Sequence, residues 1–317
     1  MRSIQKLRSH RGAIYRALSQ FLLECGVSTP LLRCKLFHPR SPQSAGTPGS
    51  VSEPGSFFSS WLSRLSFLRI LCALCVSVAI PLSSSAQKRQ LNVAAASDLK
   101  FAMTELASAY EKQSGVKLNL TFGSSGNFYA QIQNGAPFDI FFSADKEHPD
   151  KLEHAGLIEP LPDSPYAIGR IVLWVPADSS LEPAKLQWRT LLESSVQRIA
   201  IGNPAHAPYG RAAIAALRKA GIYDQVKSKL VFGENISQAS QFVRSGNAQA
   251  GIIAKSLVVA PEMKEGKSWE IPQDSYPPLT QWAAILKSSS NKQAARGFLE
   301  YFGKQRAILE KYGFVLP

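Results

Sequence analysis

Small hydroxyl, glycine and flexible polar residues stand at four places where an apolar run gives way to a helical pattern. These places are Ser97-Asp98, Gly123 to Gly126, Pro208 to Gly210 and Asn235 to Gln238. The first turn of a helix presents unpaired N–H groups and the positive end of the helix dipole, and both favour an anion. None of the four places contains Lys or Arg. The chemistry that they predict is the capture of a small, desolvated anion by neutral hydrogen-bond donors.

Each turn taken alone also has an ordinary structural explanation. A serine at a helix start is commonly a cap, and Gly123 and Gly126 can serve a tight turn and nothing more. The same type of turn recurs twice in each half of the region after residue 87. This recurrence favours a shared ligand over four independent caps.

A serine hydrolase is the alternative from a different class. Ser125 and His206, with Asp98 or Asp139, are the residues from which a triad could be built. However, "FGSSG" lacks the G-x-S-x-G elbow that exposes a nucleophilic serine. His206 stands between two alanines, where an exposed loop histidine is expected. We therefore expect no enzyme.

Nucleotide and zinc sites are not indicated by the motifs. "GSSG" lacks the Lys-Ser/Thr of a phosphate-binding loop, and no G-x-G-x-x-G follows a strand. After residue 86 the chain has only three histidines, widely spaced, and no cysteine, which does not fit a zinc site. No cofactor is expected.

The elements that must position these turns alternate along the chain. Strand-like runs cover 91–96, 116–122, 138–144, 166–176, 198–202, 229–233 and 250–254, and helical patterns follow most of them. This alternation predicts an α/β fold with largely parallel sheets. Ligands of such sheets bind beyond the carboxyl ends of the strands. Two lobes facing across a cleft would bring all four turns onto one ligand.

The charge of the chain is concentrated at its N-terminal end. Of the formal net charge of +13, residues 1–86 contribute +8, from ten Lys/Arg against two Asp/Glu, and the other residues contribute +5. The region after residue 86 has no basic run, so nucleic acid is not an expected partner.

Residues 61–86 have the order of a secretory signal peptide. A basic flank at Arg64 and Arg69 precedes an apolar core from Ile70 to Leu82 and small residues ending at Ala86. The core is too short for a stable membrane span. All four cysteines lie in the first 86 residues, so cleavage near Ala86 would leave a domain without cysteine, suited to an oxidising compartment.

Residues 1–60 precede this signal and are unusual for an exported protein. Their end, 40–60, has a Pro/Gly/Ser composition typical of disorder. We interpret residues 1–60 as a disordered extension or as the product of a start site assigned too far upstream.

At the level of whole motifs the sequence resembles a known family. The motifs that carry the resemblance are, in order, "AAASDL", "FGSSG…AQIQNGAPFDIFFSAD", "YAIGRIVLW", "IGNPAHAPYG" and the terminal "KYGFVLP". Together, over about residues 90–317, they are similar to periplasmic molybdate-binding proteins of ABC transporters. The resemblance implies a type II periplasmic binding fold of two α/β lobes that closes on molybdate or tungstate. It divides the region into lobe 1 (87–165), lobe 2 (166–275) and a return segment with a C-terminal helix (276–317).

The resemblance also implies the ligand-binding residues. The first and second serines of the family fall on Ser97 and Ser125, and backbone donors fall on Tyr209 and Ile236. Some members place an amide side chain where this chain has Asp98. Because a carboxylate facing the oxyanion would repel it, we expect Asp98 to offer its backbone N–H and to turn its carboxylate away. A further donor of some members, a strand tyrosine, is replaced here by Ala254.

The implied partners follow from the same family. They are a membrane permease with a cytoplasmic ATPase, and the binding protein itself is expected to be a periplasmic monomer. Molybdenum or tungsten would be present only within the bound oxyanion. Sulfate is the alternative ligand. Prolines near 163–168 and 272–280 predict where the chain crosses between the lobes.

Overall fold

The computed structural model describes residues 90–317 except residues 262 and 264. All of them belong to the compact unit Leu82–Pro317. The predicted extension at 1–60, the predicted signal peptide at 61–86 and the four cysteines lie outside the described residues.

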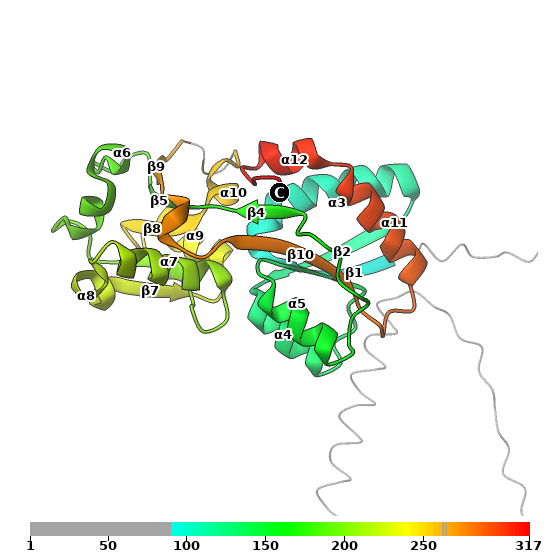
Figure 1. The fold of residues 1–317 in the computed structure, drawn as a ribbon. Helices are drawn as coiled ribbons and strands as arrows, with labels where there is room; N and C mark the ends of the chain where they lie inside the picture. The colour runs from blue at the N-terminus through cyan, green and yellow to red at the C-terminus, as the bar shows by residue number, and fades with distance from the viewer. Residues whose placement is uncertain (1–89, 262, 264) are drawn as a thin grey trace, which may run out of the picture. The chain divides into compact units, whose positions relative to one another are not determined.

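The described residues form two five-stranded sheets (Figure 1). The first has the order β2-β1-β3-β10-β4 and the second β7-β6-β8-β5-β9. The strands are β1 (Gln90–Ala96), β2 (Lys117–Gly123), β3 (Ile140–Ser143), β4 (Ala167–Gly169), β5 (Ile171–Val175), β6 (Ile199–Gly202), β7 (Leu230–Gly233), β8 (Ala250–Ala254), β9 (Lys267–Glu270) and β10 (Leu279–Ile285).

The two sheets follow one scheme of strand directions. In the first, β2, β1 and β3 are parallel, and β10 pairs antiparallel with both β3 and β4. In the second, β7, β6 and β8 are parallel, and β5 pairs antiparallel with both β8 and β9. One strand in each sheet therefore opposes the other four, which confirms the predicted mostly parallel α/β architecture.

Helices connect the strands and cover the sheets. The α-helices are α3 (Lys100–Ser114), α4 (Ser125–Gln133), α5 (Glu147–His154), α6 (Pro183–Leu186), α7 (Pro208–Lys219), α8 (Tyr223–Val226), α9 (Ile236–Arg244), α10 (Lys255–Val258), α11 (Lys292–Gly303) and α12 (Arg306–Lys311). Short 3-10 helices are η1 (Ser97–Leu99), η2 (Gln187–Leu192), η3 (Lys227–Lys229) and η4 (Gln273–Ser275). Gly115 ends α3 with a left-handed φ of 72°, as helix C-termini prefer.

Lobe 1 has helices on both faces of the first sheet (Figure 1). On one face α3, α11 and α12 pack against β1 and β3, where Phe142 and Phe298 belong to one buried cluster. On the other face α4 and α5 pack over Phe128, Phe141 and Leu152. Burial of these side chains is the main force that holds the first sheet and its helices together.

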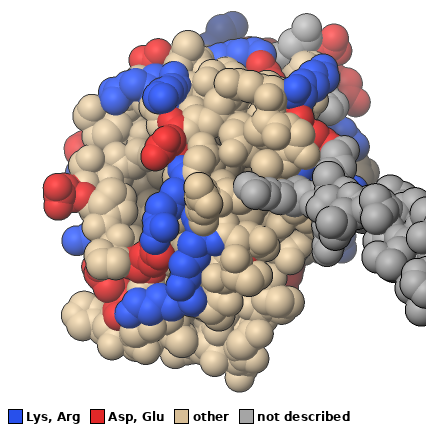
Figure 2. Space-filling view, turned by 90° about the vertical axis from the view of Figure 1, so that its right-hand side faces the viewer, with Lys and Arg blue, Asp and Glu red and all other residues tan. Residues whose placement is uncertain are grey.

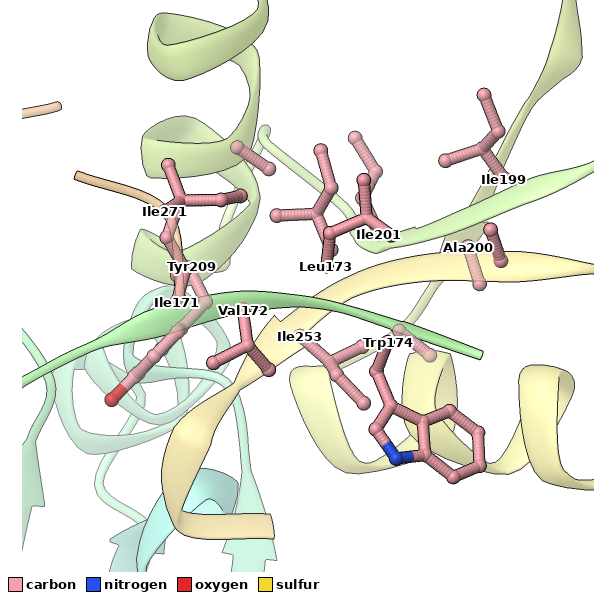
Figure 3. Packing of buried hydrophobic residues seen from close by; sticks show 14 of the residues in the cluster. Ile171, Val172, Leu173, Trp174, Ile199, Ala200, Ile201, Tyr209, Ile253 and Ile271 are labelled. Atoms are coloured by element: carbon pink, nitrogen blue, oxygen red, sulfur yellow. The ribbon is translucent and has the colours of Figure 1, made fainter. Parts of the chain in front are cut away.

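Lobe 2 has a core built from buried aliphatic side chains of its strands (Figure 3). Ile171, Leu173 and Ile201 are fully buried there. Tyr209 of α7 belongs to the same cluster, but its hydroxyl oxygen points away from the other labelled side chains in Figure 3. A tyrosine placed in this way combines an apolar anchor with a polar group at the edge of the lobe.

The chain crosses from the first sheet to the second at Arg170. The run 166–176, expected to be one strand of lobe 2, is instead two: β4 pairs with β10 in the first sheet, and β5 pairs with β8 and β9 in the second. The single-strand prediction was wrong because the apolar run continues through a position where the pairing partner changes. The first crossing therefore lies two residues beyond the predicted segment 163–168. The chain returns between Glu270 at the end of β9 and Leu279 at the start of β10, which overlaps the predicted segment 272–280.

On the face drawn in Figure 2, Lys and Arg form a narrow band with Asp and Glu beside it, and uncharged residues cover most of the surface. Two ion pairs of lobe 1 are Lys311–Glu105 and Arg296–Glu159, both at 2.7 Å. Within residues 90–317, with the two gaps noted above, no helix combines the length and the apolar character needed to cross a membrane.

Candidate oxyanion-binding site

The four predicted turns meet at one small pocket between the lobes. Its lining residues are Ala96, Ser97, Asp98, Gly123, Ser124, Ser125, Ala144, Ala207, Pro208, Tyr209 and Ile236. All five residues predicted as ligand contacts are in this set. The structure thus brings these five residues together, although Ser97 and Ile236 are 139 positions apart in the sequence.

Each predicted contact stands where a strand ends and a helix begins. Ser97 follows β1 and opens η1, and Ser125 is the first residue of α4. In lobe 2, Tyr209 follows Pro208, the first residue of α7, and Ile236 is the first residue of α9. Proline suits the first helical position because its fixed φ is helical and no N–H is needed there. Helix N-termini of both lobes therefore point their N–H groups at one pocket.

Capping and pocket roles fall on different residues. Ser124 caps α4 by accepting from the N–H of Asn127 at 3.4 Å, and Asn235 caps α9 by accepting from the N–H of Gln238 at 3.0 Å. Ser97 and Ser125 are not the caps of these helices. Capping of the helix that each one begins therefore does not account for the two serines that we predicted to bind ligand.

The hydroxyls of Ser97 and Ser125 act as acceptors in the bonds that the structure contains. Ser97 Oγ accepts from the N–H of Ser237 at 3.2 Å, across the lobes, and Ser125 Oγ accepts from the N–H of Ala144 at 2.9 Å. A hydroxyl has one donor hydrogen besides its acceptor sites. Neither of these bonds uses that hydrogen, so each serine retains a donor for an anion.

The pocket lining contains no Lys or Arg, and its only ionisable carboxyl is that of Asp98. The cavity measures about 10 Å³, which corresponds to about one water molecule. Ser97, Asp98 and Ser125 are each no more than 1 % exposed. In the described part of the chain, no group of three or more His, Cys, Asp or Glu side chains could hold a metal ion.

The side chain of Asp98 is directed to the other lobe. Its Oδ2 accepts from the hydroxyl of Tyr209 at 2.9 Å, and its backbone carbonyl accepts from the hydroxyl of Ser256 at 2.7 Å. Burial raises the pKa of Asp98 to about 7, against the lowering effect of hydrogen bonds from Tyr209, from nearby backbone N–H groups and from Gln281. Burial and the nearby Asp98 raise the pKa of Tyr209 well above its ordinary value, so its hydroxyl stays a donor.

His206 links the lobes beside the pocket. Its Nδ1 lies 2.9 Å from Ser124 Oγ, and its carbonyl accepts from the N–H of Gly126 at 2.9 Å. The expectation of a merely exposed loop histidine was therefore wrong, because the approach of the second lobe covers most of its side chain, which is 19 % exposed. The ring contacts Ser124, not the Ser125 of the alternative hydrolase triad.

An ion pair also joins the lobes. Arg211 of α7 contacts the carboxylate of Asp145, which follows β3, and His148 contacts the same carboxylate at 2.8 Å. The sequence analysis missed this contact and the roles of Ser124 and His206. No local pattern could have found them, because the partners are more than 60 positions apart: 66 for Asp145 and Arg211, and 82 for Ser124 and His206.

Two mixed sheets joined by two crossing segments, with a pocket of neutral donors between them, define a two-lobed solute-binding protein. The chain belongs to the family of bacterial extracellular solute-binding proteins, which it matches over residues 91–315. Membership in a solute-binding family agrees with our expectation that the protein is not an enzyme.

Individual relatives are similar over most of their length. The chain is 37 % identical to the molybdate-binding protein ModA of Rhodobacter capsulatus, covering 77 % of this chain and 93 % of the relative. It is 38 % identical to ModA of Azotobacter vinelandii, covering 74 % and 93 %. The solved structure of the periplasmic molybdate-binding protein of Azotobacter vinelandii superposes with a TM-score of 0.66 at 35 % identity, covering 72 % of this chain and 99 % of that one.

A sulfate-binding protein from Mycobacterium tuberculosis has the same fold at 15 % identity, with a TM-score of 0.57 over 71 % of this chain and 86 % of that chain. At this identity the likeness concerns the fold alone.

Proposed function

We propose that this protein captures molybdate or tungstate in the pocket between its lobes and delivers the oxyanion to the membrane permease of an ABC importer. The observation that carries the proposal is the convergence of four helix N-termini, two from each lobe, on a buried pocket without Lys or Arg. The names of the relatives support molybdate as the ligand.

The proposed contacts are hydrogen bonds to the oxygen atoms of the anion. Ser97 and Ser125 donate their hydroxyl hydrogens from lobe 1, and the backbone N–H groups of Asp98, Tyr209 and Ile236 complete the set. The metal atom is enclosed by its own oxygens, so none of these residues is a metal ligand. Neutral donors suit an anion that is fully deprotonated at neutral pH, because the anion brings no proton that needs an acceptor.

Closure of the lobes supplies both affinity and selectivity. Donors from the two lobes contact one ligand only when the lobes are closed. The ligand therefore binds the closed form more tightly than the open form, and this difference in binding free energy stabilises the closed form. A smaller tetrahedral anion such as sulfate leaves some donors unmatched. Each unmatched buried donor costs about 1–3 kcal/mol.

The cellular setting completes the proposal. We infer that residues 61–86 direct export and are removed near Ala86, that the mature protein is a periplasmic monomer without a cofactor, and that a permease with a cytoplasmic ATPase receives the ligand. The relative from Azotobacter vinelandii, whose name includes the periplasm, supports this location.

Calorimetric titration tests the ligand. Molybdate, tungstate, sulfate and phosphate are each titrated into the purified protein at neutral pH. We expect molybdate and tungstate to bind most tightly, with sulfate weaker by about 5- to 150-fold per unmatched donor. Phosphate should be weak because hydrogen phosphate needs an acceptor for its proton, and the one carboxyl of the pocket, that of Asp98, is directed to Tyr209. A protein that prefers sulfate, or binds none of the four, contradicts the proposal.

A further inference from the structure

A buried carboxyl group lies beside the predicted anion without a compensating cation. Asp98 is 1 % exposed and lines the pocket together with Ser97 and Ser125. Its Oδ2 accepts from Tyr209 of the other lobe at 2.9 Å, whereas its Oδ1 is buried with no donor in hydrogen-bonding geometry, the Gln281 amide and the backbone N–H groups of Asp98 and Leu99 acting on the carboxyl only as nearby dipoles. An ionised carboxylate in this position would lie buried close to a dianion, which is unfavourable even though the side chain is directed to Tyr209.

The polar groups around Asp98 are neutral. They are the Tyr209 hydroxyl on α7, the Tyr166 ring just before β4, the Gln281 amide on β10 and the Ser256 hydroxyl on α10. Within the described residues Asp98 takes part in no ion pair.

Charged side chains on the neighbouring elements are engaged elsewhere. Lys100 Nζ lies 5.6 Å from the ring centre of Phe101, Lys255 pairs with Glu270, and Arg211 pairs with Asp145. Arg244 is the last residue of α9, at the end opposite the pocket. Arg170, on the crossing segment beside Tyr209, donates to Gln273 Oε1. Among the described residues no cation acts on the Asp98 carboxyl to hold it ionised.

We propose that Asp98 is a positioning residue that takes up one proton when a dianionic oxyanion binds, so that its neutral carboxyl holds Tyr209 across the lobes without repelling the ligand. The proton comes from solvent and goes to Oδ1, which leaves Oδ2 free to accept from the Tyr209 hydroxyl. No other bond changes. The inference rests on the proposed function and names a proton as a second ligand of the same site.

The direction of the pH dependence follows from burial. Burial between the lobes raises the pKa of Asp98 from the ordinary value of 3.8 to about 7, and this contribution of burial is lost when the lobes separate and water reaches the carboxyl. A nearby dianion raises the pKa further. Proton uptake therefore favours the closed, liganded form fully at low pH. Between the ordinary and the raised pKa of Asp98, the affinity for molybdate falls by up to about tenfold per pH unit. Above the raised pKa the carboxyl no longer takes up a proton, and this contribution to the affinity is lost.

Calorimetry with molybdate measures this proton directly. Titrations from about pH 6 to about pH 8, each in two buffers of different ionisation enthalpy, give the number of protons bound per ligand. For the parent protein we expect uptake of up to about one proton near neutral pH and an affinity that falls with rising pH. Molybdate that binds without proton uptake at any pH in this range overturns the inference and leaves the proposed function intact. Absence of binding overturns both.

Two variants separate this role from a purely structural one. Asp98→Asn keeps the shape and an acceptor for Tyr209 but cannot ionise, so it should bind molybdate without proton uptake, and at about pH 8 more tightly than the parent. Asp150→Asn, a carboxyl on α5 outside the pocket, should behave as the parent does. An Asp98→Asn protein that still takes up the proton contradicts the assignment. If that variant does not fold, the proton count of the parent decides.

Discussion

The backbone N–H of Gly126 donates to the carbonyl oxygen of His206 at 2.9 Å, so the first turn of α4 in lobe 1 touches the loop that precedes α7 in lobe 2. A β-carbon at position 126 would lie 2.7 Å from that carbonyl oxygen and 2.8 Å from the Cβ of His206. Glycine is therefore required at this place by the contact between the lobes in the closed form.

Gly126→Ala should hinder closure without unfolding either lobe. Because the clash is with backbone atoms of the other lobe, the lobes must stay slightly apart, and molybdate should bind about tenfold more weakly or worse. Solution scattering should then show a smaller decrease in radius on adding molybdate than the parent shows. Gly303→Ala, which meets nothing within 4 Å, is the matched control. A Gly126→Ala protein with parental affinity and parental compaction would show that this contact does not accompany binding.

Ser97→Ala and Ser125→Ala should each weaken molybdate binding by about one to two powers of ten. Each substitution removes one predicted hydroxyl donor from a buried anion, a loss of about 1–3 kcal/mol. Ser125→Asp should nearly abolish binding because it places a carboxylate in the pocket. Calorimetry gives the affinities, far-ultraviolet circular dichroism verifies folding, and Ser108→Ala, exposed on α3, is the control. Folded Ser97→Ala and Ser125→Ala proteins that both bind like the parent would disprove the assigned site.

Arg211→Met should weaken molybdate binding by about 2- to 10-fold, because the ion pair with Asp145 joins the lobes only when they are closed and is partly screened by water. Burial opposes ionisation of Asp145, but the hydrogen bond and charge of His148 and the charge of Arg211 outweigh it and keep its pKa below the usual value. The carboxylate therefore remains ionised at neutral pH.

Salt provides an independent measurement for this pair. The effect of Arg211→Met should shrink as the ionic strength rises. Arg218→Met is the control, since Arg218 lies on the same helix but packs over Tyr223 within lobe 2. Equal losses for the two variants would mean that the contribution of Arg211 comes from α7 itself and not from the contact between the lobes.

The exported protein should begin near Gln87. The basic flank, apolar core and small residues that end at Ala86 form the predicted signal. Intact-mass measurement on protein recovered from the periplasm gives the start directly. A mature form that retains residues 1–60 would refute the proposed cleavage.

Much of the fold was predictable because its signals are local. The apolar run of β1, the alternation of β2 and the glycine that ends α3 each reflect the preferences of neighbouring residues, and the structure has all three close to their predicted bounds. The four turns were recognisable for the same reason, since a helix start has a local composition. Local composition indicated the turns, and the resemblance to the molybdate-binding family implied the particular contacts at Ser97, Asp98, Ser125, Tyr209 and Ile236, which the structure places at one pocket.

The sequence by itself determined which segments become strands and helices and where neutral donors stand, because these depend on residues a few positions apart. Only the tertiary structure decided that the run 166–176 divides at Arg170, since the partners β10 and β8 come from distant parts of the chain. The contact of Asp98 with Tyr209 spans 111 positions, and that of Ser124 with His206 spans 82. Such pairs form when two separately packed lobes meet, and the burial that raises the pKa of Asp98 exists only once they have met.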